Sequence, residues 1–222
     1  PCTFVGHPLA DDIPLSSNKE EARHALDLPL DKKILALMPG SRGGELSRLT
    51  ESFLLSAEEL LKEDPELHFV APMISDVRAE QFQSLKHNIA PNLAVTIIIN
   101  KTQQVIAASD CLLMASGTVT LEAALIKRPM VICYKFNFFT YHMFKGLVKL
   151  EWFSLPNLLI KKTLVPELLQ GKVTVDNIVP LLKERLYQDQ TFLEKEYMKI
   201  HLSLKQNASK EAAKAVMDLM SK

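Results

Sequence analysis

The sequence predicts an α/β fold, with one Rossmann-like parallel sheet, helices on both of its faces and a helical C-terminal appendage. Two observations support this prediction. Short apolar runs alternate with segments of helical spacing through residue 134, which is the pattern of right-handed β-α-β crossovers. After residue 138, strand-like runs almost disappear. We therefore expect a core at 1–134 and, at 135–222, an aromatic and basic segment and a helical tail that complete the same domain.

The individual elements follow from apolar periodicity. Short, mainly apolar runs are typical of parallel strands buried on both faces, and they predict strands at 34–38, 67–71, 94–99, 111–114 and 130–134. Apolar residues three and four positions apart, such as Leu46, Leu49 and Phe53, predict helices. We expect these helices at 18–26, 45–62, 76–88, 102–109 and 118–126 in the core, and at 163–170, 175–186, 192–204 and 211–220 in the tail.

Composition narrows the class of protein. The chain has 222 residues, enough for one large domain, and its 26 basic residues balance its 26 acidic ones, so we expect no nucleic-acid partner. The three cysteines are far apart and the six histidines show no ligand spacing, so neither a disulfide framework nor a metal site is expected. No apolar run approaches the roughly 18 residues that cross a bilayer, and no signal peptide is visible. We expect a cytoplasmic location.

The first expected strand ends in a glycine-rich turn with the sequence PGSRGGE at 39–45. Glycines let a backbone approach an anion, the start of the following helix faces that anion, and Arg42 is a forked donor. A tight turn whose glycines only satisfy backbone angles would show the same pattern. The turn matches neither the nucleotide P-loop nor the dinucleotide fingerprint. We interpret it as a candidate phosphate cradle that requires a second element.

A second loop of small polar residues follows the strand expected at 111–114. Ser116, Gly117 and Thr118 precede a helix, and Glu122 lies about one turn into it, where a carboxylate can accept hydrogen bonds from a ribose diol. An ordinary acid in a first helical turn would occupy the same position. Because ligands of open parallel sheets bind at the carboxyl ends of the strands, we expect the two loops to converge on one diphosphate.

Four segments, taken in their order and spacing, are similar to the motifs of a known family: FVGHPLAD at 4–11, MPGSRGGE at 38–45, ASGTVTLE at 115–122 and SLPNLL at 154–159. Together they closely resemble the lipid-A-disaccharide synthase family, which are glycosyltransferases of the two-domain B type (GT-B). The resemblance runs from about residue 4 to the helical tail. It implies that this chain is the nucleotide-binding half of a GT-B fold and that the N-terminal acceptor domain is absent from it.

The resemblance also implies an activity and partners. The family joins UDP-2,3-diacylglucosamine to 2,3-diacylglucosamine 1-phosphate and releases UDP and a β-1,6-linked lipid A disaccharide 1-phosphate. Expected partners are this lipid donor, the glycolipid acceptor, the missing domain and the inner-membrane surface, with a homo-oligomer left open. The acceptor site and the general base are expected in the missing domain, so this chain alone is expected to be incomplete for catalysis.

The resemblance assigns roles to individual residues. Arg42 and Asn157 are the expected catalytic residues, with Asn157 facing the cleft and the reacting end of the donor. The expected nucleotide-binding residues are Gly40, Ser41, Arg42, Gly43, Glu45, Ser116, Gly117, Thr118 and Glu122. No cofactor or metal is expected, because Arg42 and a helix dipole can neutralise the departing diphosphate.

An aromatic and basic segment follows the core. Eight of the fifteen aromatic residues lie at 134–153, interleaved with lysines. This composition suits the headgroup layer of an anionic membrane, where rings insert shallowly and lysines reach phosphates. We expect membrane or acyl-chain contacts from Phe138, Phe139, Phe144, Lys145 and Lys149. Packing of these rings beneath the tail helices or against the missing domain is the alternative.

Two other functions stay open at this point. A UDP-sugar epimerase of GT-B architecture also binds UDP between two such domains, but it needs a histidine and carboxylate set for elimination that we do not find. A non-catalytic nucleotide-binding module needs only the two loops. Release of UDP on mixing donor and acceptor with the full-length protein would separate the three.

Overall fold

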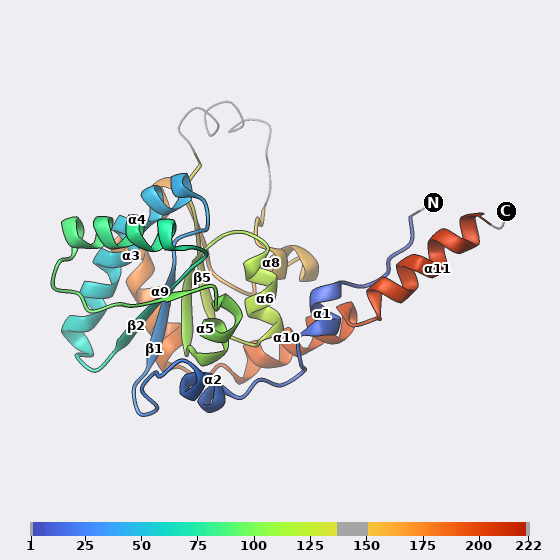
Figure 1. Cartoon of the computed structure of the whole chain (residues 1–222), viewed down its shortest axis with the longest axis horizontal. Coiled ribbons are helices and arrows are strands. Elements are labelled where there is room, and N and C mark those ends of the chain that lie inside the picture. The colour runs from blue at the N-terminus through green and yellow to red at the C-terminus, as the bar shows by residue number, and fades with distance from the viewer. Residues whose placement is uncertain (1, 137–150, 221–222) are drawn as a thin grey trace.

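A computed structural model describes residues 2–136 and 151–220, which contain a six-stranded parallel sheet (Figure 1). The strands are β1 (Ile34–Met38), β2 (His68–Met73), β3 (Thr96–Ile99), β4 (Cys111–Ala115), β5 (Met130–Tyr134) and β6 (Glu167–Leu169). Their order in the sheet is β3-β2-β1-β4-β5-β6, and every neighbouring pair is parallel. The five strands expected from the sequence are confirmed, with ends shifted by at most two residues.

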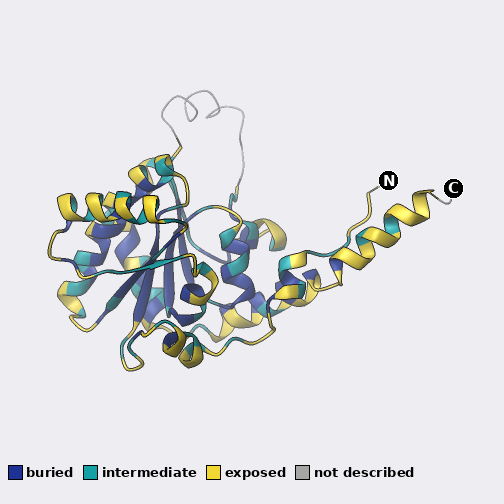
Figure 2. Cartoon of the chain, in the orientation of Figure 1, coloured by how far each residue is buried: buried dark blue, intermediate teal, exposed yellow. Residues whose placement is uncertain are grey.

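Helices cover both faces of the sheet. One face carries α3 (Gly43–Glu63), α4 (Asp76–Ile89) and α9 (Val175–Tyr187), and the other carries α2 (Lys19–Ala25), α5 (Thr102–Ala108), α6 (Val119–Leu125) and α10 (Thr191–Leu204). Leu35 and Leu37 point to the first cluster, and Ile34 and Ala36 point to the second. Because both faces of β1 are buried, its sequence is a continuous apolar run (Figure 2).

The long helix α3 shows how packing stabilises this arrangement. Its residues Leu46, Leu49, Phe53 and Leu60 form an apolar stripe with at most 2% exposure, facing the sheet and α9. Burying each such side chain contributes roughly 1.5–3 kcal/mol relative to leaving it exposed. The expected helix at 45–62 is confirmed and begins two residues earlier, at Gly43.

The helix expected at 163–170 is wrong. Residues Glu167–Leu169 form β6, which pairs with β5 through Cys133 and Leu168, and a short 3-10 helix, η1 (Gln170–Lys172), follows. A three-residue strand is too short to show its own periodicity. The sheet therefore continues beyond residue 134. A further helix, α8 (Leu155–Ile160), was not expected, and Pro156 is tolerated there because it lies in the first turn.

The two ends of the described chain lie together. Helix α1 (Pro8–Asp12) contacts α10 and α11 (Ala208–Met220). The Asp11 carboxylate accepts hydrogen bonds where α11 begins, from the preceding Asn207 N at 2.9 Å and from Ala208 N at 2.6 Å. Helix α11 extends away from the sheet, as does the N-terminal segment (Figure 1). Within the described residues, none of the helices combines the length and apolar character that a membrane span requires.

Candidate functional site

A groove opens at the carboxyl edge of the sheet, above β1 and β4. The chain proceeds from β1 to β2 and β3 on one side, and from β4 to β5 and β6 on the other, so this is the topological switch point where open parallel sheets bind ligands. The cavity volume is about 290 Å³. Seven of the expected site residues line this central groove: Gly40, Ser41, Arg42, Glu45, Ser116, Gly117 and Thr118.

Sequence reasoning missed one wall of the central groove. Pro72 and Ile74 come from the end of β2, and Thr102 from the start of α5 after β3. Ile74 is 56% exposed, so it offers an apolar surface beside the polar loops. The available signal was positional, because the ends of parallel strands β2 and β3 must lie at the same edge as β1 and β4.

The first loop requires its glycine at residue 40. Gly40 has φ +119°, a conformation that side chains rarely adopt, and a Cβ there would lie 2.7 Å from the Cβ of Glu45. Glu45 therefore folds tightly over the loop. Its carboxylate accepts a hydrogen bond from Arg42 Nη1 at 3.0 Å, and its side chain is 13% exposed.

Arg42 combines exposure with an open helix start. Its side chain is 83% exposed. Arg42 is also the N-cap residue of α3, and no side chain makes a capping hydrogen bond there. The first amides of a helix without a cap are available to an anion, and the helix dipole favours negative charge there. The groove thus offers the Arg42 guanidinium next to a helix start that no side chain caps.

Helix α4 braces the first loop from outside. Gln81 Nε2 donates to Gly43 O at 3.1 Å and to Ser47 Oγ at 3.0 Å, while Arg78 Nη1 donates to Gln81 Oε1. A Cβ on Gly43 would lie 2.6 Å from Arg78 Nη1, so the absence of a side chain lets the guanidinium approach the first turn of α3. The loop geometry is therefore set by residues 38 positions away in sequence.

The second loop is held at both ends and open in the middle. Ser116 Oγ donates to Phe153 O at 3.4 Å, and Thr120 Oγ1 donates to Gly117 O at 2.8 Å. A Cβ on Gly117 would meet nothing within 4 Å. The space above Gly117 is therefore free, which suits a loop that admits a ligand.

Glu122 lies on α6 beneath the second loop and does not line the central groove. Among the described residues its carboxylate has no hydrogen-bond or ion-pair partner. Burial raises the pKa of the Glu122 carboxyl above its ordinary value. A partly buried acid with a raised pKa and no partner near a groove is typical of a functional site.

Asn157 does not line the central groove, but it is among the residues that line a neighbouring groove beside Trp152 and Phe153. Asn157 is fully buried in α8. Its amide nitrogen donates to Val165 O and to Glu167 Oε1, at 2.9 and 2.8 Å, and its oxygen accepts from the backbone amides of Leu164 and Val165. These bonds use both amide protons and the oxygen. Asn157 therefore holds the segment before β6 in place.

The expected membrane or acyl contacts Phe138, Phe139, Phe144, Lys145 and Lys149 lie outside the described residues. The described part of the chain contains no group of three or more His, Cys, Asp or Glu side chains arranged to hold a metal ion.

Solved structures share the fold at low sequence identity. The chain superposes on an E. coli ADP-heptose lipopolysaccharide heptosyltransferase II with a TM-score of 0.54 and 15% identity, covering 78% of this chain and 52% of that one. A UDP-GlcNAc 2-epimerase from Neisseria meningitidis gives 0.55 and 16%, covering 90% and 49%. The fold and the central groove define the class, a Rossmann-like domain of the type found in GT-B glycosyltransferases.

The chain belongs to the lipid-A-disaccharide synthetase family, whose model matches residues 1–220. It is 66% identical over 221 residues to a lipid-A-disaccharide synthase from Colwellia psychrerythraea and 45% identical over 216 residues to one from Idiomarina loihiensis. All or nearly all of this chain is covered, but only 56% and 57% of those proteins. The chain thus spans a little over half the length of these curated relatives.

Proposed function

We propose that this chain is the nucleotide-sugar-binding part of a lipid-A-disaccharide synthase. The complete protein would transfer a 2,3-diacylglucosamine unit from UDP to 2,3-diacylglucosamine 1-phosphate, forming a β-1,6 link. The observation that carries the proposal is the convergence of the two loops, around Arg42 and around Gly117, on one groove at the switch point. Family membership favours transfer over epimerisation, while the fold alone is shared with an epimerase.

The proposed chemistry places developing charge next to Arg42. The 6-hydroxyl oxygen of the acceptor attacks the anomeric carbon of the donor sugar, and the bond from that carbon to the β-phosphate oxygen breaks. The hydroxyl proton passes to a general base that we assign to the part of the protein outside this chain. Negative charge grows on the leaving UDP, where the Arg42 guanidinium and the uncapped start of α3 stabilise it.

Glu45 has a defined role in this proposal. Its carboxylate accepts a hydrogen bond from Arg42 Nη1 at 3.0 Å. A diphosphate brings its own oxygens to the guanidinium and repels the carboxylate, so Arg42 exchanges one acidic partner for another. Glu45 thereby keeps the arginine oriented before the substrate arrives, and Ser41, Ser116 and Thr118 supply hydroxyls around the phosphates.

Glu122 is proposed to accept the two hydroxyls of the ribose. Its unpaired, partly buried carboxylate supports this role, because a diol supplies the two donors that the residue lacks. We assign Asn157 to positioning, since its buried amide bonds hold the segment that carries Phe153, and Phe153 O accepts from Ser116 in the second loop.

Calorimetric titration with UDP tests the nucleotide assignment. We expect the chain to bind UDP weakly and to transfer no sugar by itself, because catalysis requires both reactants to be held in near-attack geometry. A Ser41→Ala, Thr118→Ala double variant should weaken UDP binding, and Ser203→Ala on α10, far from the groove in sequence and not among its lining residues, is the control. A cooperatively folded chain that binds no UDP would remove the nucleotide site.

We also propose that the complete protein binds the surface of the inner membrane through residues 134–153. The start of this segment is anchored, since Arg48 Nε donates to Lys135 O at 3.0 Å and Lys135 Nζ donates to Ser52 Oγ at 3.0 Å. Each lysine near anionic lipid contributes about 1 kcal/mol. Replacing Phe138, Phe139 and Phe144 by serine should weaken sedimentation with anionic vesicles and leave UDP binding intact. Unchanged sedimentation, or loss of folding, would favour internal packing of the rings.

A further inference from the structure

A second groove lies beside the central one at the same edge of the sheet, above β5 and β6. Its lining includes Trp152, Phe153, Thr163, Glu167, Gln170 and Lys172, and its volume is about 470 Å³. The two grooves adjoin at Phe153, because that residue lines the second groove while its carbonyl accepts the hydrogen bond from Ser116, which lines the central one. A ligand extending from the phosphate loops toward β6 would enter this space.

The floor of the second groove is fixed and its carboxylate is saturated. Glu167 accepts hydrogen bonds from three donors: Phe153 N at 3.0 Å, Ser154 N at 2.9 Å and Asn157 Nδ2 at 2.8 Å. Its negative charge is therefore spread over these donors and does not face an incoming anion unscreened. The same bonds set the position of the backbone that carries the aromatic wall.

The aromatic wall consists of Trp152 and Phe153. Trp152 Nε1 donates to Thr163 Oγ1 at 3.0 Å, which fixes the indole ring, and the Phe153 ring packs 6.3 Å from the Tyr134 ring. Rings fixed in this way offer a flat apolar face to a ligand that is itself partly apolar.

The lining of the second groove also includes uncommitted polar groups. Among the described residues, the Gln170 amide and the Lys172 ammonium make no side-chain hydrogen bond or ion pair. Gln170 has φ +53°, a left-handed conformation that is costly for a side-chain residue and persists at ligand sites. An amide that donates and accepts, a free cation and an aromatic face together suit a sugar ring carrying a phosphate.

We propose that the second groove binds the ring and phosphate of a hexosamine phosphate. The ring packs on Trp152 and Phe153, Gln170 bonds its hydroxyls, and Lys172 pairs with the phosphate. The proposal rests on the proposed function only in the choice of sugar. Both substrates of that reaction have this chemistry, the donor as a glycosyl diphosphate and the acceptor as a sugar 1-phosphate, so the test must separate the two sources.

Trp152 is the only tryptophan of the 222 residues, so its fluorescence reports on this groove. We expect a saturable change on titrating the chain with N-acetylglucosamine 1-phosphate or with UDP-N-acetylglucosamine, and little change with UDP or inorganic phosphate. If the sugar 1-phosphate still binds when UDP saturates the central groove, the ligand is the acceptor. A response to UDP-N-acetylglucosamine that UDP abolishes identifies the donor sugar.

Two variants make the test specific. Lys172→Met should weaken binding of the responding sugar phosphate about tenfold, which is the loss of about 1.4 kcal/mol. Gln170→Asn keeps a residue that tolerates the left-handed backbone but shortens the amide, and it should weaken binding severalfold. Lys214→Met on exposed α11 is the control. UDP affinity measured by calorimetry should not change in any of the three.

The outcomes distinguish this proposal from the proposed function. A folded chain that binds UDP but shows no Trp152 response or heat with either sugar phosphate overturns the second site alone. An equal response to inorganic phosphate or UDP also overturns it. Sugar-phosphate binding without UDP binding keeps the second site and removes the nucleotide assignment.

Discussion

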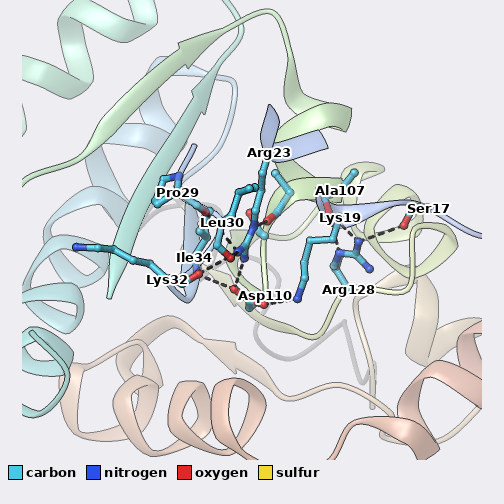
Figure 3. Close-up of polar contacts among 12 residues, drawn as sticks. Ser17, Lys19, Arg23, Pro29, Leu30, Lys32, Ile34, Ala107, Asp110 and Arg128 are labelled. Carbon is cyan, nitrogen blue, oxygen red and sulfur yellow. Dashed lines mark hydrogen bonds and ion pairs between the residues drawn. The ribbon is translucent and has the colours of Figure 1, made fainter. Parts of the chain in front are cut away.

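At the amino edge of the sheet Arg23 is 4% exposed and bonds to five acceptors, whereas at the carboxyl edge Arg42 is 83% exposed and bonds to one. Arg23 donates to Asp110 Oδ2 at 2.6 Å and to the carbonyls of Ala108, Pro29, Leu30 and Lys32 (Figure 3). The two arginines, at opposite edges of one sheet, thus differ in how many of their hydrogen-bond donors are already used within the protein.

The carboxylates of the two edges differ in the same way. Asp110 accepts from Lys19, from Arg23 and from the amide of Ile34 at the start of β1 (Figure 3). Burial alone would raise the pKa of the Asp110 carboxyl, but these hydrogen bonds and charges hold it below its ordinary value. Among the residues that the structure describes, Glu122 has no such partners, and burial raises its pKa. At the amino edge, the paired charge of Asp110 stabilises the fold. At the carboxyl edge, the unpaired carboxyl of Glu122 is available to a ligand.

Removing Asp110 is expected to have the largest effect. Asp110→Ala leaves the Arg23 guanidinium buried without its counter-charge, which costs about 3–5 kcal/mol. Urea unfolding measures this loss, and UDP affinity of the remaining folded chain should be unchanged. Glu66→Ala, which breaks the exposed pair with Lys32, is the matched control and should change stability little. Equal losses in the two variants would contradict the contrast between the edges.

Removing Arg42 should lower activity and leave stability unchanged, which is the reverse of the effect expected for Asp110. Arg42→Ala in the complete protein should lower turnover by about 10²-fold, or on the order of 3 kcal/mol, because the guanidinium acts on charge that grows in the transition state. The urea midpoint should stay the same, since the side chain is largely exposed. Steady-state kinetics with both lipid substrates measure the effect, with Arg48→Ala on α3 as a comparison that removes a cation bonded to Lys135 O. A wild-type rate would exclude Arg42 from the site.

The core of the fold was predictable because its signals are local. Strands buried on both faces, such as β1 and β5, appear as unbroken apolar runs, and α3 shows its stripe over 21 residues. The strand β6 was missed because it has three residues and is specified by its pairing with β5, not by its own pattern. Pairing with a distant strand does not produce a recognisable sequence pattern in so short a segment.

The site was predictable in part for the same reason. Glycines and small polar residues at strand ends mark the loops around Arg42 and Gly117, and these loops do line one groove. Ile74 also belongs to that groove, and only its position directly after β2 could have indicated this, because its residue type carries no signal. Asn157 was assigned from the family resemblance, and its hydrogen bonds could not be predicted, because its partner Glu167 lies ten positions away on a strand that was not expected.

Glu122 gives the smallest and most specific test of the comparison. A carboxyl with a raised folded pKa holds its proton to higher pH than the unfolded chain does, so its contribution to stability is lost as pH rises from the unfolded value through the folded one. Glu122→Gln removes that cost and should slightly stabilise the chain at neutral pH, with the gain shrinking in acid. UDP affinity should fall about tenfold if the carboxylate binds the ribose. Thermal unfolding from pH 4 to 8 and calorimetry measure both effects, with Glu211→Gln on exposed α11 as the control.

Asp110→Asn should show the opposite sign, losing stability most at neutral pH and least in acid, because the lowered pKa of Asp110 makes its contribution largest above the unfolded value. Glu122→Gln and Asp110→Asn variants that respond to pH in the same direction would show that the two edges do not differ in how they hold charge.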